Sequence, residues 1–254
     1  MRIIWGIVLA AALACGAAQA KDWKKIRIGT EGAYPPFNFV DKAGELQGFD
    51  IDIAKAICDK LKAECSFVAQ DWDGIIPALL ANKYDAIVAS MSITEERKQR
   101  VAFSDKYYNT PARFVAKKGA KLDATRAGLK GKAIGAQRAT THASYLEDNF
   151  KDAEIKLYGT QDEANLDLAN GRLDAVLADA TVLYEWLEKT DEGKCCGFVS
   201  EPIVAPKWFG EGVGVALRKD DKELAAMVNK AIAEIRADGT YEKINKKYFP
   251  FSIY

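Results

Sequence analysis

One short stretch of the chain combines the residue types that bind a carboxylate. Residues 90–97 read Ser-Met-Ser-Ile-Thr-Glu-Glu-Arg. Thr94 is a favoured helix N-cap residue with two acids after it, so a helix is predicted to begin here. Arg97 would project from that first turn beside free backbone N–H groups, and a guanidinium in such surroundings holds a carboxylate bidentately. The alternative is a solvated charge, which is the interpretation that fits Lys98 and Arg100.

A repeated unit places two more polar residues at comparable positions. LANKYDAIVAS, residues 80–90, returns as LANGRLDAVLAD, residues 168–179. Each copy reads as a helix end, a turn, Asp-Ala and an apolar run that stops on a polar residue, Ser90 in one and Asp179 in the other. Because ligands of open α/β sheets lie beyond the carboxyl ends of the strands, these two residues could face each other across a cleft. The alternative is that Asp-Ala before an apolar run is simply how many strands begin.

The elements that carry these residues alternate between strands and helices. Residues 26–32 read as a strand, and residues 48–61 as a helix whose apolar face holds Phe49, Ile53, Ile57 and Leu61. Further strands are predicted at 66–70, 85–90, 132–137, 156–159, 174–179 and 212–221, and helices at 73–82, 141–150, 161–171, 180–189, 223–239 and 241–249. Thr140 and Thr141 give the helix at 141–150 a start rich in hydroxyl groups. Such alternation predicts an α/β fold with mostly parallel sheets flanked by helices, and the separating stretch 108–119 predicts two lobes.

The net charge and the N-terminal sequence limit the partners and the compartment that can be expected. Lys plus Arg and Asp plus Glu number 36 each, so no net field favours nucleic acid or an anionic membrane. Arg2, an uncharged run over residues 3–18 and a final Ala18-Gln19-Ala20 predict a cleaved secretory signal, residues 1–20. The alternative is lipid attachment at Cys15, although Ala12-Leu13-Ala14 places alanine and not the usual leucine at the third position before the cysteine. Cleavage would remove one base and no acid, and would release the mature chain from about Lys21 into the periplasm.

Four cysteines remain after the predicted cleavage, and in an oxidising compartment they can form disulfides. Cys58 lies near the end of a predicted helix and Cys65 opens the next strand, so a short disulfide could join the two elements. Cys195 and Cys196 are adjacent, and could be free thiols, a strained vicinal pair or an intermolecular link. The only histidine is His142, so no Cys/His spacing suggests zinc, and we expect neither a metal nor a cofactor.

Several motifs in order resemble one known family. They are TEGAYPPFNF, GFDIDIAKAICDKL, WDGIIPALLANKYDAI, SMSITEERKQRVAFSDKYY, GRLDAVLAD and DGTYEKINKKYF. Through them residues 24–254 resemble the periplasmic solute-binding proteins of polar amino-acid ABC importers, especially the lysine/arginine/ornithine and histidine binders. The resemblance implies a type II periplasmic-binding-protein fold, two α/β lobes joined by two crossing strands that close over a ligand. It assigns residues 21–109 and 212–254 to the first lobe and 110–211 to the second, and it implies the Cys58–Cys65 bridge.

The resemblance also implies a role for individual residues. Arg97 matches the arginine that clamps the ligand α-carboxylate, with Ser92 and Thr140 as further donors. Asp179 matches the acid that receives the α-ammonium, with Ser90 opposite. Tyr34 and Trp72 match aromatic residues on either side of the ligand side chain, and Glu31 stands where cationic binders carry an acid for the distal group. The complete predicted set is Glu31, Tyr34, Trp72, Ser90, Met91, Ser92, Arg97, Gln137, Thr140 and Asp179.

Departures from the family pattern affect the far end of the ligand. Glu31 is longer than the Asp of some relatives, Gln137 and Arg138 occupy a loop that often carries an apolar residue and Gln, and His142 follows at a helix start. The expected ligand is arginine, lysine or ornithine, delivered by a monomer to the membrane subunits of an ABC permease. Alternatives are an opine, histidine or glutamine. A periplasmic dehydratase of the prephenate or arogenate type is a further alternative, but no Ser/His/Asp or Cys/His set appears. A receptor ectodomain would need a membrane span downstream.

Overall fold

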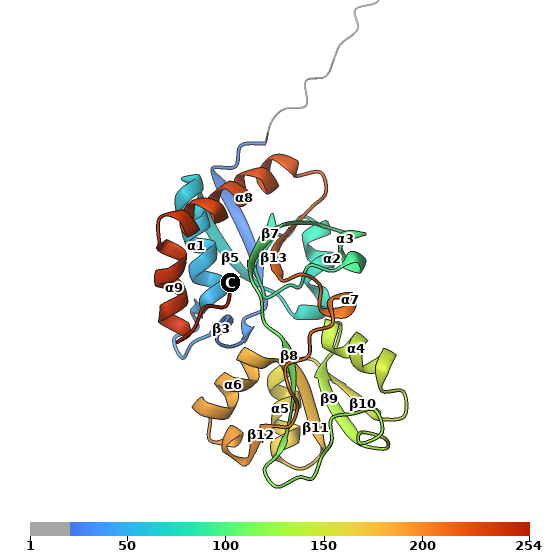
Figure 1. The fold of residues 1–254 in the computed structure, drawn as a ribbon. Helices are drawn as coiled ribbons and strands as arrows, with labels where there is room; N and C mark the ends of the chain where they lie inside the picture. The colour runs from blue at the N-terminus through green and yellow to red at the C-terminus, as the bar shows by residue number, and fades with distance from the viewer. Residues whose placement is uncertain (1–20) are drawn as a thin grey trace, which may run out of the picture.

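The protein has two lobes, each built on a five-stranded sheet, in the computed structural model, which describes residues 21–254 (Figure 1). The predicted signal and Cys15 lie outside the described residues. The first sheet has the order β5-β1-β6-β13-β7, with β1 (Lys25–Thr30), β5 (Glu64–Ala69), β6 (Ala86–Ile87), β7 (Ala102–Tyr108) and β13 (Val213–Leu217). The second has the order β10-β9-β11-β8-β12, with β8 (Ala112–Lys117), β9 (Ala133–Gln137), β10 (Glu154–Tyr158), β11 (Ala175–Asp179) and β12 (Cys196–Phe198).

One strand in each sheet runs against the other four. β1 pairs in parallel with β5 and β6, whereas β13 lies antiparallel to β6 and β7. In the second sheet β8 is antiparallel to β11 and β12. Both reversed strands follow a crossing between the lobes, so each enters its sheet from the side of the other lobe. The predicted mostly parallel α/β architecture is confirmed, but the stretch 108–119 is more than a separator, because it contains the buried strand β8.

The repeated sequence unit occupies the same place in both sheets. β6 and β11 are each the third strand in their order, and each pairs in parallel with the second strand of that order, β1 and β9. The acid before each strand accepts a backbone hydrogen bond from that neighbour, Asp85 from Arg27 N at 3.1 Å and Asp174 from Ala133 N at 2.9 Å. The two copies are therefore one structural unit used once in each lobe.

Helices cover both faces of the two sheets (Figure 1). Phe49, Ile53 and Ile57 of α1 are buried in the first core, as their spacing predicts, and Leu61 packs partly buried against it. No helix within residues 21–254 is long and apolar enough to cross a membrane. The helices are α1 (Phe49–Leu61), α2 (Ile75–Leu80), α3 (Glu95–Lys98), α4 (Thr141–Asn149), α5 (Gln161–Ala169), α6 (Ala180–Lys189), α7 (Pro206–Phe209), α8 (Lys222–Ala237) and α9 (Thr240–Tyr248), with 3-10 turns η1 (Trp72–Gly74) and η2 (Glu192–Cys195). A small sheet holds β2 (Ala33–Tyr34), β3 (Asn38–Val40) and β4 (Leu46–Gln47).

Both cysteine pairs are bonded. The Cys58–Cys65 disulfide joins the end of α1 to β5 across 6.2 Å between Cα atoms, which confirms the predicted staple. Cys195 and Cys196 form a vicinal disulfide between η2 and β12, the second of the three alternatives.

Two segments connect the lobes. The first runs from β7 to β8 through residues 109–111, and the second returns from β12 through α7 to β13. An isolated bridge pairs Ala112 with Ile203 beside the crossing, and another pairs Ser92 with Val213 where the chain re-enters the first lobe. The boundaries at 109/110 and 211/212 remain a prediction.

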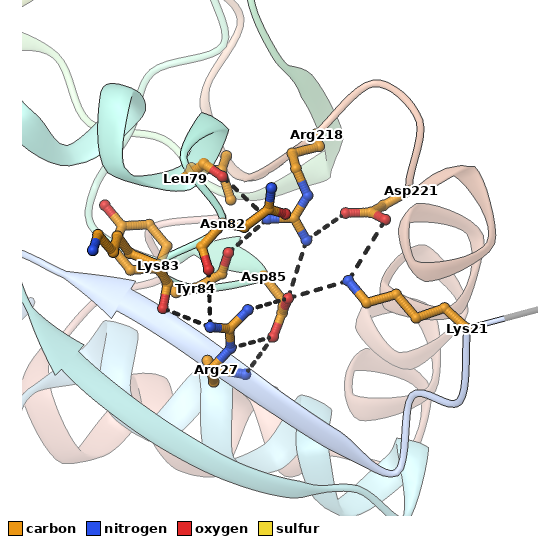
Figure 2. Close-up of polar contacts among 9 residues, drawn as sticks. All are labelled: Lys21, Arg27, Leu79, Asn82, Lys83, Tyr84, Asp85, Arg218 and Asp221. Carbon is orange, nitrogen blue, oxygen red and sulfur yellow. Dashed lines mark hydrogen bonds and ion pairs between the residues drawn. The ribbon is translucent and has the colours of Figure 1, made fainter.

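A charged cluster just before β6 joins the N-terminal part of the first lobe to the segment that follows β13 (Figure 2). Asp85, 4% exposed, accepts from the side chains of Arg27 and Arg218, each at 3.0 Å, and from Lys21 at 3.3 Å. Arg218, which follows β13, also pairs with Asp221 at 2.6 Å. Burial alone would raise the pKa of Asp85, but the hydrogen bonds from Arg27 and Arg218 outweigh it and hold that pKa well below its usual range.

Candidate functional site

The predicted ligand residues gather around one cavity between the lobes. It is lined by Glu31, Tyr34, Trp72, Ala89, Ser90, Ser92, Arg97, Gln137, Thr140, Thr141, His142 and Asp179. Of the predicted set only Met91 does not line it: its fully buried side chain packs in the core beside Trp72 and lines a neighbouring groove.

The first-lobe wall places a guanidinium in the cavity. Thr94 caps α3 by accepting a hydrogen bond from Arg97 N at 3.2 Å, as the sequence predicts. Arg97 Nη1 donates to Ser92 O at 3.1 Å, and the guanidinium lies 5.2 Å from the centre of the Trp72 ring. Burial lowers the pKa of Arg97 to about 10, so the group stays cationic at neutral pH. One cation in a buried wall is a receptor for a carboxylate.

The second-lobe wall presents Asp179 and the start of α4. Asp179 is the last residue of β11 and the N-cap of α6, yet its side chain makes no cap hydrogen bond and is left to other partners. Thr140 caps α4 through Ala143 N at 3.1 Å and donates its own hydroxyl to Gln137 O at 2.6 Å. The hydroxyl of Thr140 is thus already committed as a donor, and Thr141, outside the predicted set, is the other hydroxyl residue of this wall.

Hydrogen bonds cross the cleft along its length. Tyr34 OH donates to Asp179 Oδ2 at 2.6 Å, and Trp72 Nε1 donates to Ala139 O at 2.9 Å. At the rim Arg138 Nε donates to Asp73 Oδ2 at 2.6 Å, although both side chains are about half exposed. These contacts join lobes that are connected only by two narrow segments, so the structure is a closed one.

The far end of the cavity is acidic. Glu31 accepts a hydrogen bond from Gln137 Nε2, which also donates to Gly159 O at 3.0 Å. Burial raises the pKa of Glu31 to about 7, against the hydrogen bond from Gln137, and the nearby carboxylates Asp162, Asp71 and Asp73 add to the rise. A carboxylate with this balance of partners is suited to receive a cation.

His142 enters the site although the predicted set omits it. Its side chain is 7% exposed, and Nε2 lies 3.6 Å from Asp179 Oδ1 without a hydrogen-bond partner. The imidazole packs 5.3 Å from the Phe209 ring, so α7 supports it from the connection between the lobes. The sequence does offer one indication of this placement, because His142 lies two residues after Thr140, the predicted donor at the start of α4. Within residues 21–254 no group of three or more His, Cys, Asp or Glu side chains could hold a metal ion.

Sequence comparisons agree with this geometry. The profile of the bacterial extracellular solute-binding proteins, family 3, matches residues 26–251. The chain is 50% identical over 233 residues to the L-arginine-binding protein of Pseudomonas aeruginosa, covering 91% of this chain and 90% of that one. It is 44% identical over 231 residues to the lysine/arginine/ornithine-binding periplasmic protein of Escherichia coli, covering 90% and 89%.

A solved structure supports the same relationship. A periplasmic binding protein of Salmonella typhimurium, described as having high arginine specificity, superimposes with a TM-score of 0.83 and 36% sequence identity. The match covers 89% of this chain and 99% of that one.

Proposed function

Because the chain belongs to the bacterial extracellular solute-binding proteins, family 3, we propose that it captures a cationic amino acid in the periplasm for an ABC importer. L-Arginine is the first candidate ligand. Arg97 receives the α-carboxylate, Asp179 and Ser90 receive the α-ammonium, and Glu31 receives the distal guanidinium. Tyr34 and Trp72 border the methylene chain, and Ser92, Gln137, Thr140 and Met91 complete or support the walls.

The observation that carries the proposal is the charge of the cavity. Its lining holds two carboxylates, Glu31 and Asp179, against one guanidinium, Arg97. A zwitterion alone would leave Glu31 without a partner, whereas an amino acid with a cationic side chain matches all three groups. Burying charges is unfavourable unless each meets an opposite charge, so the cavity selects the cationic ligand over its neutral counterparts.

The aromatic residues support a long, extended side chain. Trp72 is 8% exposed, and its indole nitrogen donates to Ala139 O, which holds the ring against the cavity. Aromatic faces attract both methylene groups and guanidinium ions. This favours arginine over histidine or glutamine, whose side chains are shorter.

A binding protein, and not a dehydratase, is the proposal for two reasons. The relatives described above carry the names of binding proteins. In addition, Glu31 and His142 belong to opposite lobes, and Glu31 already bonds Gln137 while His142 lies beside Asp179. The implied partners are the membrane subunits of a permease, and the proposed working form is a monomer.

Thermal denaturation of the refolded, ligand-stripped protein tests the proposal. The ligands are the twenty amino acids, ornithine, citrulline, octopine and nopaline. L-Arginine at 100 times its Kd should add about 2.7 kcal/mol to the free energy of unfolding, with the other basic amino acids next. No stabilisation by any amino acid would overturn the proposal. Appearance of product absorbance on mixing with prephenate or arogenate would establish the dehydratase instead.

A further inference from the structure

A buried carboxylate outside the cavity organises its first-lobe wall. Asp50, the second residue of α1, is fully buried. Its Oδ2 accepts hydrogen bonds from Ser90 Oγ at 3.0 Å and Asn38 Nδ2 at 2.9 Å, and its Oδ1 accepts from Tyr107 OH at 2.7 Å. Three segments distant in the sequence thus meet at one side chain, and Ser90 is the member that also lines the cavity.

The same carboxylate reaches a second ligand-facing segment. Asn38, which donates to Asp50, accepts a hydrogen bond from Gly32 N at 2.9 Å with its own Oδ1. Gly32 lies between Glu31 and Tyr34, two residues of the cavity. Ser90 itself has φ of 53°, a left-handed conformation that costs a non-glycine residue energy and is retained where other contacts impose it. Asp50 supplies such a contact.

The direction of the Ser90 hydrogen bond has a chemical consequence. A hydroxyl has one proton and two acceptor lone pairs. Burial raises the pKa of Asp50 to about 6, although hydrogen bonds from Tyr107, Asn38 and Ser90 oppose the rise, so at pH 7 and above the group is ionised and only accepts. The single proton of Ser90 is therefore directed to Asp50. Only acceptor lone pairs remain for the cavity, and these suit an ammonium and repel a carboxylate.

We propose that Asp50 is a positioning residue that fixes Ser90 as a hydrogen-bond acceptor and thereby sets which end of the amino acid lies against Ser90 and Asp179. The inference rests on the proposed function, because it concerns the orientation of the amino acid assigned to this cavity. Asp50 does not line the cavity, and its effect on the orientation of the ligand is transmitted through Ser90.

Ligand selectivity in Asp50 variants tests the inference. The probes are L-arginine and 5-guanidinopentanoate, which lacks only the α-ammonium. Asp50→Ala frees the Ser90 proton, and the preference for arginine, measured by calorimetry, should fall roughly 10- to 100-fold, since the lost interaction involves charged groups. Asp50→Asn should stay within about threefold of the wild-type preference, because an amide oxygen at the Oδ2 position still accepts from Ser90 while Tyr107 can turn to accept from the amide.

A matched control separates positioning from general damage to the lobe. Asn245 of α9 is 6% exposed and holds the C-terminal segment through Phe251 O at 2.7 Å and Ile253 N at 3.2 Å. Asn245→Ala should lower stability and leave the preference for arginine unchanged. An equal loss for both probes in Asp50→Ala, or an unchanged preference, would overturn the inference.

Neutron diffraction from ligand-free wild-type crystals gives an answer that needs neither a variant nor a ligand. The deuterium on Ser90 Oγ should point to Asp50 Oδ2, and a deuterium directed into the cavity would refute the inference. Failure of the wild type to bind either probe would count against the proposed function, and the neutron result would then decide the role of Asp50 alone.

Discussion

The hydroxyl of Tyr34 in the first lobe donates to the carboxylate of Asp179 in the second at 2.6 Å. Asp179 is also the proposed partner of the ligand α-ammonium. The contact that joins the lobes and the contact that holds the ligand therefore share one carboxylate, and binding and closure should be coupled.

This coupling predicts that ligand makes the protein more compact. A ligand that bridges Arg97 and Asp179 contacts both lobes only in the closed form, so it shifts the population toward that form. Small-angle scattering should show a smaller radius of gyration with saturating L-arginine, and no change with L-glutamate at the same concentration. An unchanged radius at demonstrated saturation would contradict the closing mechanism.

Replacing Arg97 should weaken binding without unfolding the protein. Arg97→Ala leaves the ligand carboxylate in a buried site without its partner and should cost about 2–5 kcal/mol of binding free energy. Arg97→Lys should restore only part of the loss, because an ammonium cannot form the planar two-point contact. Calorimetry on variants with native circular dichroism provides the measurement, and wild-type affinity in Arg97→Ala would show that the carboxylate binds elsewhere.

Glu31→Gln should separate charged from neutral ligands. The variant keeps the shape of the side chain but removes its charge, so arginine should lose far more affinity than citrulline. Trp72→Ala is the control, since it removes the aromatic face and should weaken both ligands. If Glu31 instead only caps a turn, both ligands should change by less than about 1 kcal/mol in Glu31→Gln. Equal losses would move the specificity role to Gln137 or His142.

The pKa of Glu31 predicts a pH-dependent closure of the empty protein. In the closed structure burial raises that pKa to about 7, whereas a solvated glutamate titrates near 4.3. Because the pKa of Glu31 is higher in the closed state, its protonation stabilises closure. This stabilisation is complete below the solvated pKa of about 4.3 and is lost as the pH rises through about 7. Ligand-free protein should be more compact at pH 5 than at pH 8 by small-angle scattering, and Glu31→Gln should remove this difference. Equal radii in the wild type would contradict the prediction.

The Asp85 cluster should dominate the stability of the first lobe. Asp85→Asn removes the buried carboxylate that Arg27 and Arg218 share and leaves Arg218, whose side chain is 12% exposed, with Asp221 alone, so it should cost about 3 kcal/mol of unfolding free energy at pH 7. The pKa of Asp85 is lower in the folded protein than the unfolded-state value near 3.9, so the ionised carboxylate stabilises the fold above that pH. This contribution is lost as the pH falls toward the folded-state pKa, so the difference in unfolding free energy between wild type and Asp85→Asn should narrow below about pH 4. Asp174, with a side chain 39% exposed, occupies the same place in the second lobe, and Asp174→Asn should cost under about 1 kcal/mol. Chemical denaturation measures both, and equal costs would contradict a special role for Asp85.

Local chemistry explains why much of the protein could be read from its sequence. The α1 face follows from the spacing of Phe49, Ile53 and Ile57, and the start of α3 follows from the hydroxyl of Thr94 and the acids after it. Each depends on residues within one or two turns of each other. The repeat that ends in Ser90 and Asp179 works the same way, because closely similar local sequences form the third strand of two sheets with corresponding strand orders.

Tertiary structure decided what depends on residues far apart in the chain. Sequence patterns predict neither the reversed direction of β8 nor the environment of His142, because the first is set by the path between lobes and the second by Asp179 and Phe209. The ordinary acids Glu31 and Asp50 acquire raised pKa values only when other elements bury them. The sequence by itself therefore determined most of the helices, about half of the strands, the two lobes and most of the cavity lining. Hydrogen-bond direction and charge state were decided by packing, since both depend on which distant groups exclude water.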